Sequence, residues 1–158
     1  MRGLSLCVLL TIPVACSPLV GAPPPDLSGF WVLNVQKSAW GPVRKPLGAF
    51  VEIDHKEPSI AYSGKITYQD EEAREFHFAG AADGKEYPMN RSFGNGKVTI
   101  RRAGDRVLDS TFKSGDGRYI ETAQTTLSRD GTVLTRRLTL ETPAGKQRWT
   151  EVYERRQR

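Results

Sequence analysis

The sequence contains very little cysteine, and this scarcity limits how its fold can be stabilised. Its two cysteines, Cys7 and Cys16, both lie near the N-terminus. The chain beyond them therefore has no thiol with which to form a disulfide or a thiolate metal site. We expect the domain to be held together by its hydrophobic core alone.

Histidine is equally scarce, since the chain has only His55 and His77. The alternation of apolar and polar residues around them gives His55 an inward parity and His77 an outward parity. Two histidines on opposite faces of a sheet cannot bind one ion, and no cysteine is at hand to complete a ligand set. The sequence therefore predicts no metal site and no cofactor.

An excess of one charge sign is also missing. Lys and Arg number 23 and Asp and Glu 18, a formal net charge of +5, and the two signs alternate along nearly every segment. Nucleic-acid-binding proteins gather Lys and Arg into a stripe beside stacking aromatics. Only the terminal Arg155, Arg156 and Arg158 approach such a cluster, so we expect no nucleic-acid partner.

An apolar run from Leu4 to Ala15 follows Arg2, and small residues and prolines come after it. A basic residue, a short apolar run and small residues are typical of a secretory signal peptide. The run is shorter than the roughly 20 residues that a transmembrane helix needs. Residues 1–22 are therefore predicted to be a signal peptide, without a transmembrane span, and the protein to be exported.

Two kinds of signal peptide stay open. Pro13-Val14-Ala15-Cys16 partly resembles the lipobox of bacterial lipoproteins, so the signal could end before Cys16. Ordinary cleavage after Cys16 or near Ala22 fits the small-residue rule as well. We expect a periplasmic, secreted or lipid-anchored protein of a bacterial envelope, with a membrane tether only if Cys16 is lipidated.

Turn residues recur evenly after a Pro-rich, extended spacer at residues 23–28. Glycine beside Asn, Asp or Ala returns about every 9 to 14 residues, and glycine supplies the positive φ of tight hairpins. Such intervals leave room for one strand each and are too short for strand-helix-strand crossovers. The pairs are Asp83-Gly84, Asn95-Gly96, Gly104-Asp105, Asp116-Gly117, Asp130-Gly131 and Ala144-Gly145.

Between the turns, Val, Ile, Thr, Tyr and Phe alternate with polar residues at the period of a half-buried strand. No segment has a helical stripe, so we expect little helix, with one short turn near residues 38–41. The predicted strands are residues 29–35, 48–55, 60–68, 73–79, 86–92, 97–102, 106–113, 118–127, 132–141 and 147–154.

Residues 29–158 are thus predicted to form a single all-β domain. Sequential hairpins remove their exposed edges most simply by closing into an antiparallel up-and-down β-barrel, here of about 8 to 10 strands. A two-sheet sandwich is the alternative. The interior of a barrel of about eight strands is filled by its own side chains, whereas a barrel of nine or ten strands can enclose a small ligand.

Two segments resemble a known family. The opening DLSGFWVLNVQKSAWGP resembles the start of bacterial exported lipocalin-like proteins, its Gly29-Phe30-Trp31 matches the Gly-x-Trp of calycin barrels, and the closing WTEVYERR resembles their last strand. The resemblance implies a barrel like those of lipocalins and fatty-acid-binding proteins. In such a barrel Gly29 allows a tight entry into the first strand, Trp31 plugs the closed end, and Arg155, or else Arg148, covers the tryptophan.

The last strand departs from the fatty-acid-binding relatives at one place. They hold a ligand carboxylate with an Arg-x-Tyr pair, whereas this chain has Glu151-Val152-Tyr153. An acidic residue there would repel a fatty-acid anion. The resemblance therefore does not extend to fatty-acid binding.

Arg136 shares the parity of the leucines in its strand, so we expect it to point inward. A buried guanidinium needs a partner. With a two-residue turn at Ala144-Gly145, Arg136 would face Tyr153 and lie diagonal to Glu151, within reach of its carboxylate. Arg136 could thus form an internal ion pair that fixes the barrel wall, or anchor the head group of a ligand.

The leading functional hypothesis is an exported lipocalin-like binding protein for a small hydrophobic or amphipathic molecule. Its predicted ligand-binding residues are Tyr62, Phe78, Arg136, Trp149 and Tyr153, and its structural residues are Gly29, Trp31, Glu151 and Arg155. A filled barrel with a structural or protein-interaction role in the cell envelope is the alternative. An enzyme in the same barrel is the third hypothesis and would need Glu151, His55 and Arg136 to converge. No catalytic residues are predicted, and the sequence does not indicate the oligomeric state.

Overall fold

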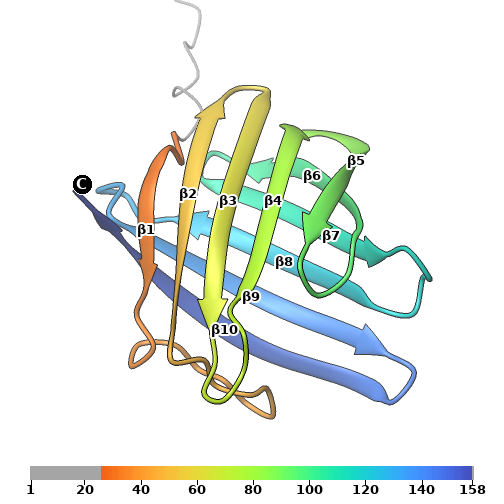
Figure 1. The fold of residues 1–158 in the computed structure, drawn as a ribbon. Coiled ribbons are helices and arrows are strands. Elements are labelled where there is room, and N and C mark those ends of the chain that lie inside the picture. Colours follow the sequence, from red (N-terminus) through yellow and green to blue (C-terminus); the bar gives the residue numbers. More distant parts are fainter. Residues whose placement is uncertain (1–25, 158) are drawn as a thin grey trace, which may run out of the picture.

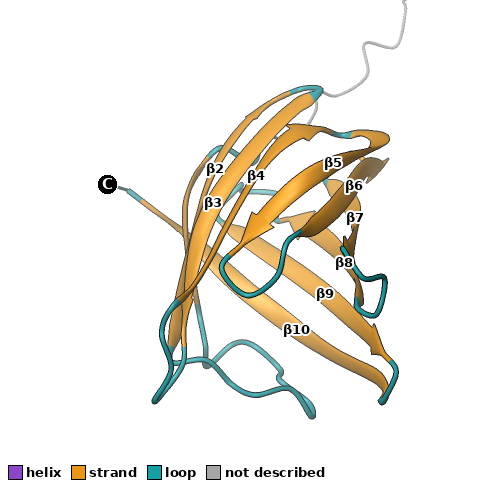
Figure 2. Ribbon diagram, turned by 45° about the vertical axis from the view of Figure 1, so that its right-hand side comes forward, coloured by secondary structure: helices purple, strands orange, loops and turns teal. Residues whose placement is uncertain are grey.

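The computed structural model describes residues 26–157. The predicted signal peptide, Cys16 and the first residues of the Pro-rich spacer lie outside this range. The described chain consists of strands and loops (Figure 2) and contains no helix, so it has none that could cross a membrane.

Ten antiparallel strands follow one another around a closed barrel (Figure 1). Each strand pairs with its neighbours in the sequence, and β1 also pairs with β10, which closes the barrel. The strands are β1 (Gly29–Leu33), β2 (Gly48–Lys56), β3 (Ser59–Thr67), β4 (Arg74–Ala81), β5 (Asp83–Arg91), β6 (Gly96–Gly104), β7 (Val107–Ser114), β8 (Ile120–Leu127), β9 (Val133–Thr142) and β10 (Gly145–Arg156). The predicted all-β, up-and-down barrel is confirmed, and the sandwich is excluded.

One predicted turn, Asp83-Gly84, lies inside a strand. β5 begins at Asp83, but Phe76 pairs with Arg91 and Phe78 with Met89, so the β4–β5 hairpin is centred on Asp83-Gly84 as predicted. The pairing of β5 with β6 shifts register between Asp83 and Glu86, as at a β-bulge. Gly84 has a φ of 79° there, which suits both the hairpin and this irregularity.

The short turn predicted near residues 38–41 lies slightly later and is not helical, since the Val43 N–H donates to the Trp40 carbonyl over 3.0 Å. This segment belongs to the loop that joins β1 to β2, and Ala39 forms an isolated antiparallel bridge with Thr150 of β10. Two backbone hydrogen bonds of 2.9 and 2.8 Å make this bridge. The pairing with β10 thus satisfies the backbone N–H and C=O groups of Ala39, which a helical turn would have paired within the loop itself.

Trp31 closes one end of the barrel, as the resemblance implied. Its side chain is fully buried, and its indole N–H donates to the backbone carbonyl of Leu27 over 2.9 Å. The guanidinium of Arg155 lies 4.5 Å from the ring centroid and donates to the carbonyl of Asp26. Arg155 therefore covers the tryptophan, whereas Arg148 is exposed.

His55 pins the chain that leads into β1 against this closed end. The backbone N–H of Leu27 donates to its Nδ1 atom over 3.3 Å, and the Ser28 hydroxyl exchanges hydrogen bonds with the backbone of His55. His55 is buried and His77 is exposed, which confirms the predicted parity of both residues. The segment before β1 is thus part of the folded domain.

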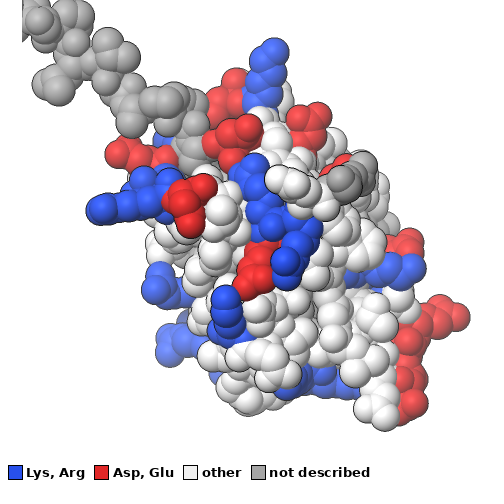
Figure 3. Space-filling view, turned by 90° about the vertical axis from the view of Figure 1, so that its left-hand side faces the viewer, with Lys and Arg blue, Asp and Glu red and all other residues white. Residues whose placement is uncertain are grey.

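The outer surface carries charges of both signs. On the face shown in Figure 3, Lys and Arg lie among Asp and Glu. The outer surface also carries cross-strand ion pairs, such as Arg101 with Asp109 at 2.8 Å and Lys65 with Glu75 at 3.2 Å. Pairs of this kind keep the outside of the sheet solvated and contribute little to stability.

We predict that β1 requires glycine at its first residue. Gly29 has a φ of 138°, which residues with a side chain rarely adopt. Gly29→Ala should lower the free energy of unfolding by about 1 to 3 kcal/mol, measured by urea denaturation.

Gly48 provides the matched control, because it also begins a strand but has no positive φ and no atom within 4 Å of a built Cβ. Gly48→Ala should leave the urea midpoint unchanged or raise it slightly. Equal losses for the two variants would show that the conformation of Gly29 is not the cause.

Candidate functional site

The barrel encloses a cavity of about 920 Å³. Residues of the β1–β2, β3–β4, β5–β6 and β7–β8 loops line it at one end, the lower end in Figure 1. At the other end it stops at Leu27 and Trp31. The cavity is therefore a pocket with its floor at the closed end and its mouth among the four loops, and its size falls within the range of small-molecule sites.

Stacked arginine and aromatic side chains frame part of this mouth. The guanidinium groups of Arg44 and Arg74 both lie near the Tyr68 ring, at 5.2 and 4.8 Å from its centroid. Arg74 also lies 5.5 Å from the ring of Phe93. Arg44 donates to the backbone carbonyl of Gln69, which ties the β1–β2 loop to the β3–β4 loop. These contacts hold the loops in place while leaving Phe93 partly exposed at the entrance.

Arg136 of β9 forms the predicted internal ion pair with Glu151 of β10. Its Nη1 atom donates to the Glu151 Oε2 atom over 3.0 Å. The two residues face each other directly, because Gly145 pairs with Thr142 and the turn is Pro143-Ala144. The predicted turn at Ala144-Gly145 is therefore wrong by one residue and the diagonal placement by two residues of register, a shift that keeps every side chain on its face.

Two further donors engage the Glu151 carboxylate. Trp149 donates its indole N–H to Oε1 over 2.9 Å, and the Tyr153 hydroxyl donates to Oε2 over 3.2 Å. Burial, followed by the nearby Glu151 charge, raises the pKa of Tyr153, so its hydroxyl stays protonated as a donor. Burial opposes the charge of Arg136, yet Glu151 and other neighbours outweigh this effect and raise the pKa of the guanidinium. This cluster is therefore a fixed, ionised structure.

A second ion pair lies in the cavity, between Arg91 at the end of β5 and Glu121 of β8. The closest distance between a guanidinium nitrogen and a carboxylate oxygen is 3.6 Å. The Arg91 guanidinium stacks on Phe112, 3.5 Å from the ring centroid, and its Nε atom is buried without a hydrogen-bond partner among the described residues. Burial lowers the pKa of Arg91, which Glu121 opposes and the like charge of Arg136 reinforces.

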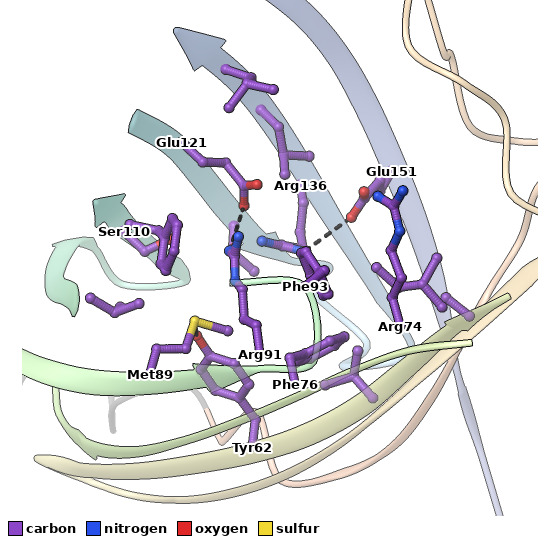
Figure 4. Close-up of a pocket in the computed structure, with 18 of the residues that line it drawn as sticks. Tyr62, Arg74, Phe76, Met89, Arg91, Phe93, Ser110, Glu121, Arg136 and Glu151 are labelled. Carbon is purple, nitrogen blue, oxygen red and sulfur yellow. Dashed lines mark hydrogen bonds and ion pairs between the residues drawn. The ribbon is translucent and has the colours of Figure 1, made fainter. Parts of the chain in front are cut away.

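The two pairs form one row across the cavity. Figure 4 shows Glu121, Arg91, Arg136 and Glu151 in that order, so that the two cations lie inside and the two carboxylates outside. Tyr62 lies beneath the row with its hydroxyl 4.0 Å from the Met89 sulfur. Burial raises the pKa of Tyr62 to about 12, so it is a neutral donor at physiological pH.

The sequence predicted most of these lining residues. Tyr62, Arg136, Trp149 and Tyr153 line the cavity, but Phe78 does not. Phe78 has the inward parity and is fully buried, because Tyr62 stacks on it at a centroid distance of 4.9 Å and separates it from the cavity.

Arg91 and Glu121 were missed. The parity argument that selected Arg136 applies to both, since Arg91 alternates inward with Tyr87 and Met89, and Glu121 with Ala123. The alternation of inward and outward residues in β5 and β8 was thus the sequence signal that could have identified both residues. The pairing of Arg91 with Glu121 joins strands that are not neighbours, so no local pattern could indicate it.

The residues named for an enzyme do not meet. Glu151 and Arg136 line the cavity, whereas His55 does not and lies beside Leu27 at the closed end. Within residues 26–157, no three His, Cys, Asp or Glu side chains come together as a metal site.

We predict that Arg136 and Glu151 stabilise the barrel as a pair. Arg136→Met leaves the Glu151 carboxylate without its counter-ion and should lower the free energy of unfolding by about 3 kcal/mol. The double variant Arg136→Met/Glu151→Gln should recover at least half of this loss, since Trp149 can still donate to the glutamine oxygen and the Tyr153 hydroxyl can accept from the amide NH2 group. Urea denaturation of the single and double variants measures the coupling.

Arg101→Met is the control, because Arg101 pairs with Asp109 on the outer surface, where its own side chain is 67% exposed. Its effect should stay below about 1 kcal/mol. A loss in Arg136→Met as small as that in Arg101→Met would contradict the role of the inner pair.

We predict a specific alkaline destabilisation from Tyr62. Its pKa is about 12 in the fold against 10.0 in its ordinary state, so the unfolded chain loses this proton first as pH rises. The stability that the protonated form contributes is complete below about pH 10 and is lost toward pH 12. Between about pH 9 and pH 11, the wild type should lose on the order of 1 kcal/mol more stability than Tyr62→Phe. Equal losses in urea denaturation would rule the effect out.

Comparison with known proteins does not assign this site to a family. No family model matches the chain, and a search of curated proteins finds no match. The likeness to calycin barrels therefore remains a resemblance in two short segments and in architecture. The residues that line the cavity are therefore the basis for inferring its role.

Proposed function

We propose that this protein is an exported, lipocalin-like binding protein that holds a small hydrophobic or amphipathic molecule inside its barrel. The observation that carries this proposal is the cavity of about 920 Å³, whose wall combines apolar side chains with a few fixed polar groups. Such a wall is typical of sites that bind by shape and by one or two directed hydrogen bonds. The predicted signal peptide is the basis for placing this function outside the cytoplasm.

The filled barrel with a structural role is the competing proposal. It requires an interior occupied by the protein's own side chains, as in barrels of about eight strands. The free volume between β3, β7 and β9 in this ten-stranded barrel favours the binding protein instead. The Arg136–Glu151 pair agrees with either function, since a fixed pair can both brace a wall and position a ligand.

The direct test is to look for a bound molecule. Protein purified from its source is measured by native mass spectrometry, and solvent extracts of it are analysed for lipids and other small molecules. A binding protein should retain a co-purifying compound or, once stripped, bind a neutral hydrophobic dye such as Nile red. Failure of both measurements would favour the filled barrel.

We predict that filling the cavity abolishes dye binding. Ser110 lines the cavity from the middle of β7, with Leu108 and Phe112 on the same face. Ser110→Trp should keep the folded circular dichroism spectrum and weaken Nile red binding by about tenfold or more, because the indole takes the space of the dye.

Thr111→Trp is the matched control. Thr111 is the next residue in β7 and is not among the residues that line the cavity. It adds the same side chain on the outer face and should leave dye affinity within about twofold. Equal weakening by both variants would place the dye outside the cavity.

A further inference from the structure

The polar groups deep in the cavity are mostly hydrogen-bond donors. A guanidinium carries five N–H groups and no acceptor. The contacts of Arg136 with Glu151 and Tyr153 use only part of its donors, and Arg91 makes an ion pair of 3.6 Å but no side-chain hydrogen bond among the described residues. The Tyr62 hydroxyl adds another donor, whose one hydrogen-bond partner within residues 26–157 is the Met89 sulfur. A ligand that reaches this region therefore needs an acceptor.

The same region has no net charge. Arg91 is balanced by Glu121, and Arg136 by Glu151, with each carboxylate on the outer side of its arginine (Figure 4). An anion placed between the arginines would lie close to two carboxylates as well, so most of the attraction is cancelled. It would also lose its hydration, a cost far larger for a charge than for a neutral carbonyl.

We propose that the cavity selects an uncharged molecule with a carbonyl oxygen and that this oxygen binds between Arg91 and Arg136. This inference rests on the proposed binding function and adds the chemical class of the ligand. The carbonyl accepts hydrogen bonds from both guanidinium groups and lies between two like charges that face each other across the cavity. The apolar remainder of the ligand lies along the aliphatic and aromatic wall.

Two compounds with similar chains test this selection. Undecan-2-one and decanoate compete with Nile red at about pH 8, where the acid is fully ionised. The ketone should bind at least about tenfold more tightly than the carboxylate, because only the carboxylate loses the hydration of a charge on entering the cavity. A carboxylate that binds as tightly as the ketone would overturn the proposal.

Glu121→Gln tests the charge balance directly. This variant leaves Arg91 without its counter-ion and gives the region one net positive charge. The affinity of decanoate relative to undecan-2-one should rise by about tenfold or more. Glu86→Gln makes the same change of charge on the outside, where Glu86 pairs with Lys97 and Lys113, and should leave the ratio unchanged. Equal ratios in the two variants would contradict the proposal.

Carbon-13 in the ketone carbonyl reports the contact itself. Its NMR resonance should move downfield on binding to the wild type, and this shift should shrink in Arg136→Met/Glu151→Gln, which removes one guanidinium and keeps the region neutral. A binding-induced shift of the same size in the wild type and in this variant would place the carbonyl away from Arg136. If no compound co-purifies and Nile red does not bind either, the binding function fails and this inference with it. If the dye binds without the preference for the ketone, only the inference fails.

Discussion

The pairing of β1 with β10 is the contact on which the rest of the structure depends, because it turns ten hairpin-connected strands into a closed wall. The register of this pairing sets Trp31 opposite Arg155, so the residues that close the barrel also plug one end. Closure leaves the sheet without a free edge. Closure also fixes the circumference at ten strands, which is wide enough to leave free volume inside the barrel. At the end opposite Trp31, the loops between the strands leave this volume open as a mouth.

Much of this fold could be predicted because it depends on local signals. Strand alternation and glycine-containing turns gave ten strands close to the observed ones, and parity alone placed Arg136 and Glu151 on the inner face. Their exact pairing was wrong by two residues, since Pro143-Ala144 forms the turn in place of Ala144-Gly145. A slip of two residues leaves the faces unchanged, so an error in register still gave a correct ion pair.

Contacts between distant strands could not be predicted in the same way. Parity placed Phe78 inside, but only the three-dimensional packing shows that Tyr62 covers it. The pairing of Arg91 with Glu121 depends on the curvature that brings the ends of β5 and β8 together around one cavity. Alternation identifies the inner face of each strand, whereas the size of the cavity and the partners across it follow from strand number and closure.

The arrangement of the interior charges leaves the Glu151 carboxylate little freedom to act as a base. Glu151 would be the natural general base, yet its two oxygens accept hydrogen bonds from Arg136, Trp149 and Tyr153. A base needs a free lone pair directed at the substrate proton. The guanidinium N–H groups of Arg91 and Arg136 that line the cavity neither accept a proton nor attack a substrate. They can hold and orient a ligand oxygen, so the same ion pairs that stabilise the wall also leave an inner surface suited to binding.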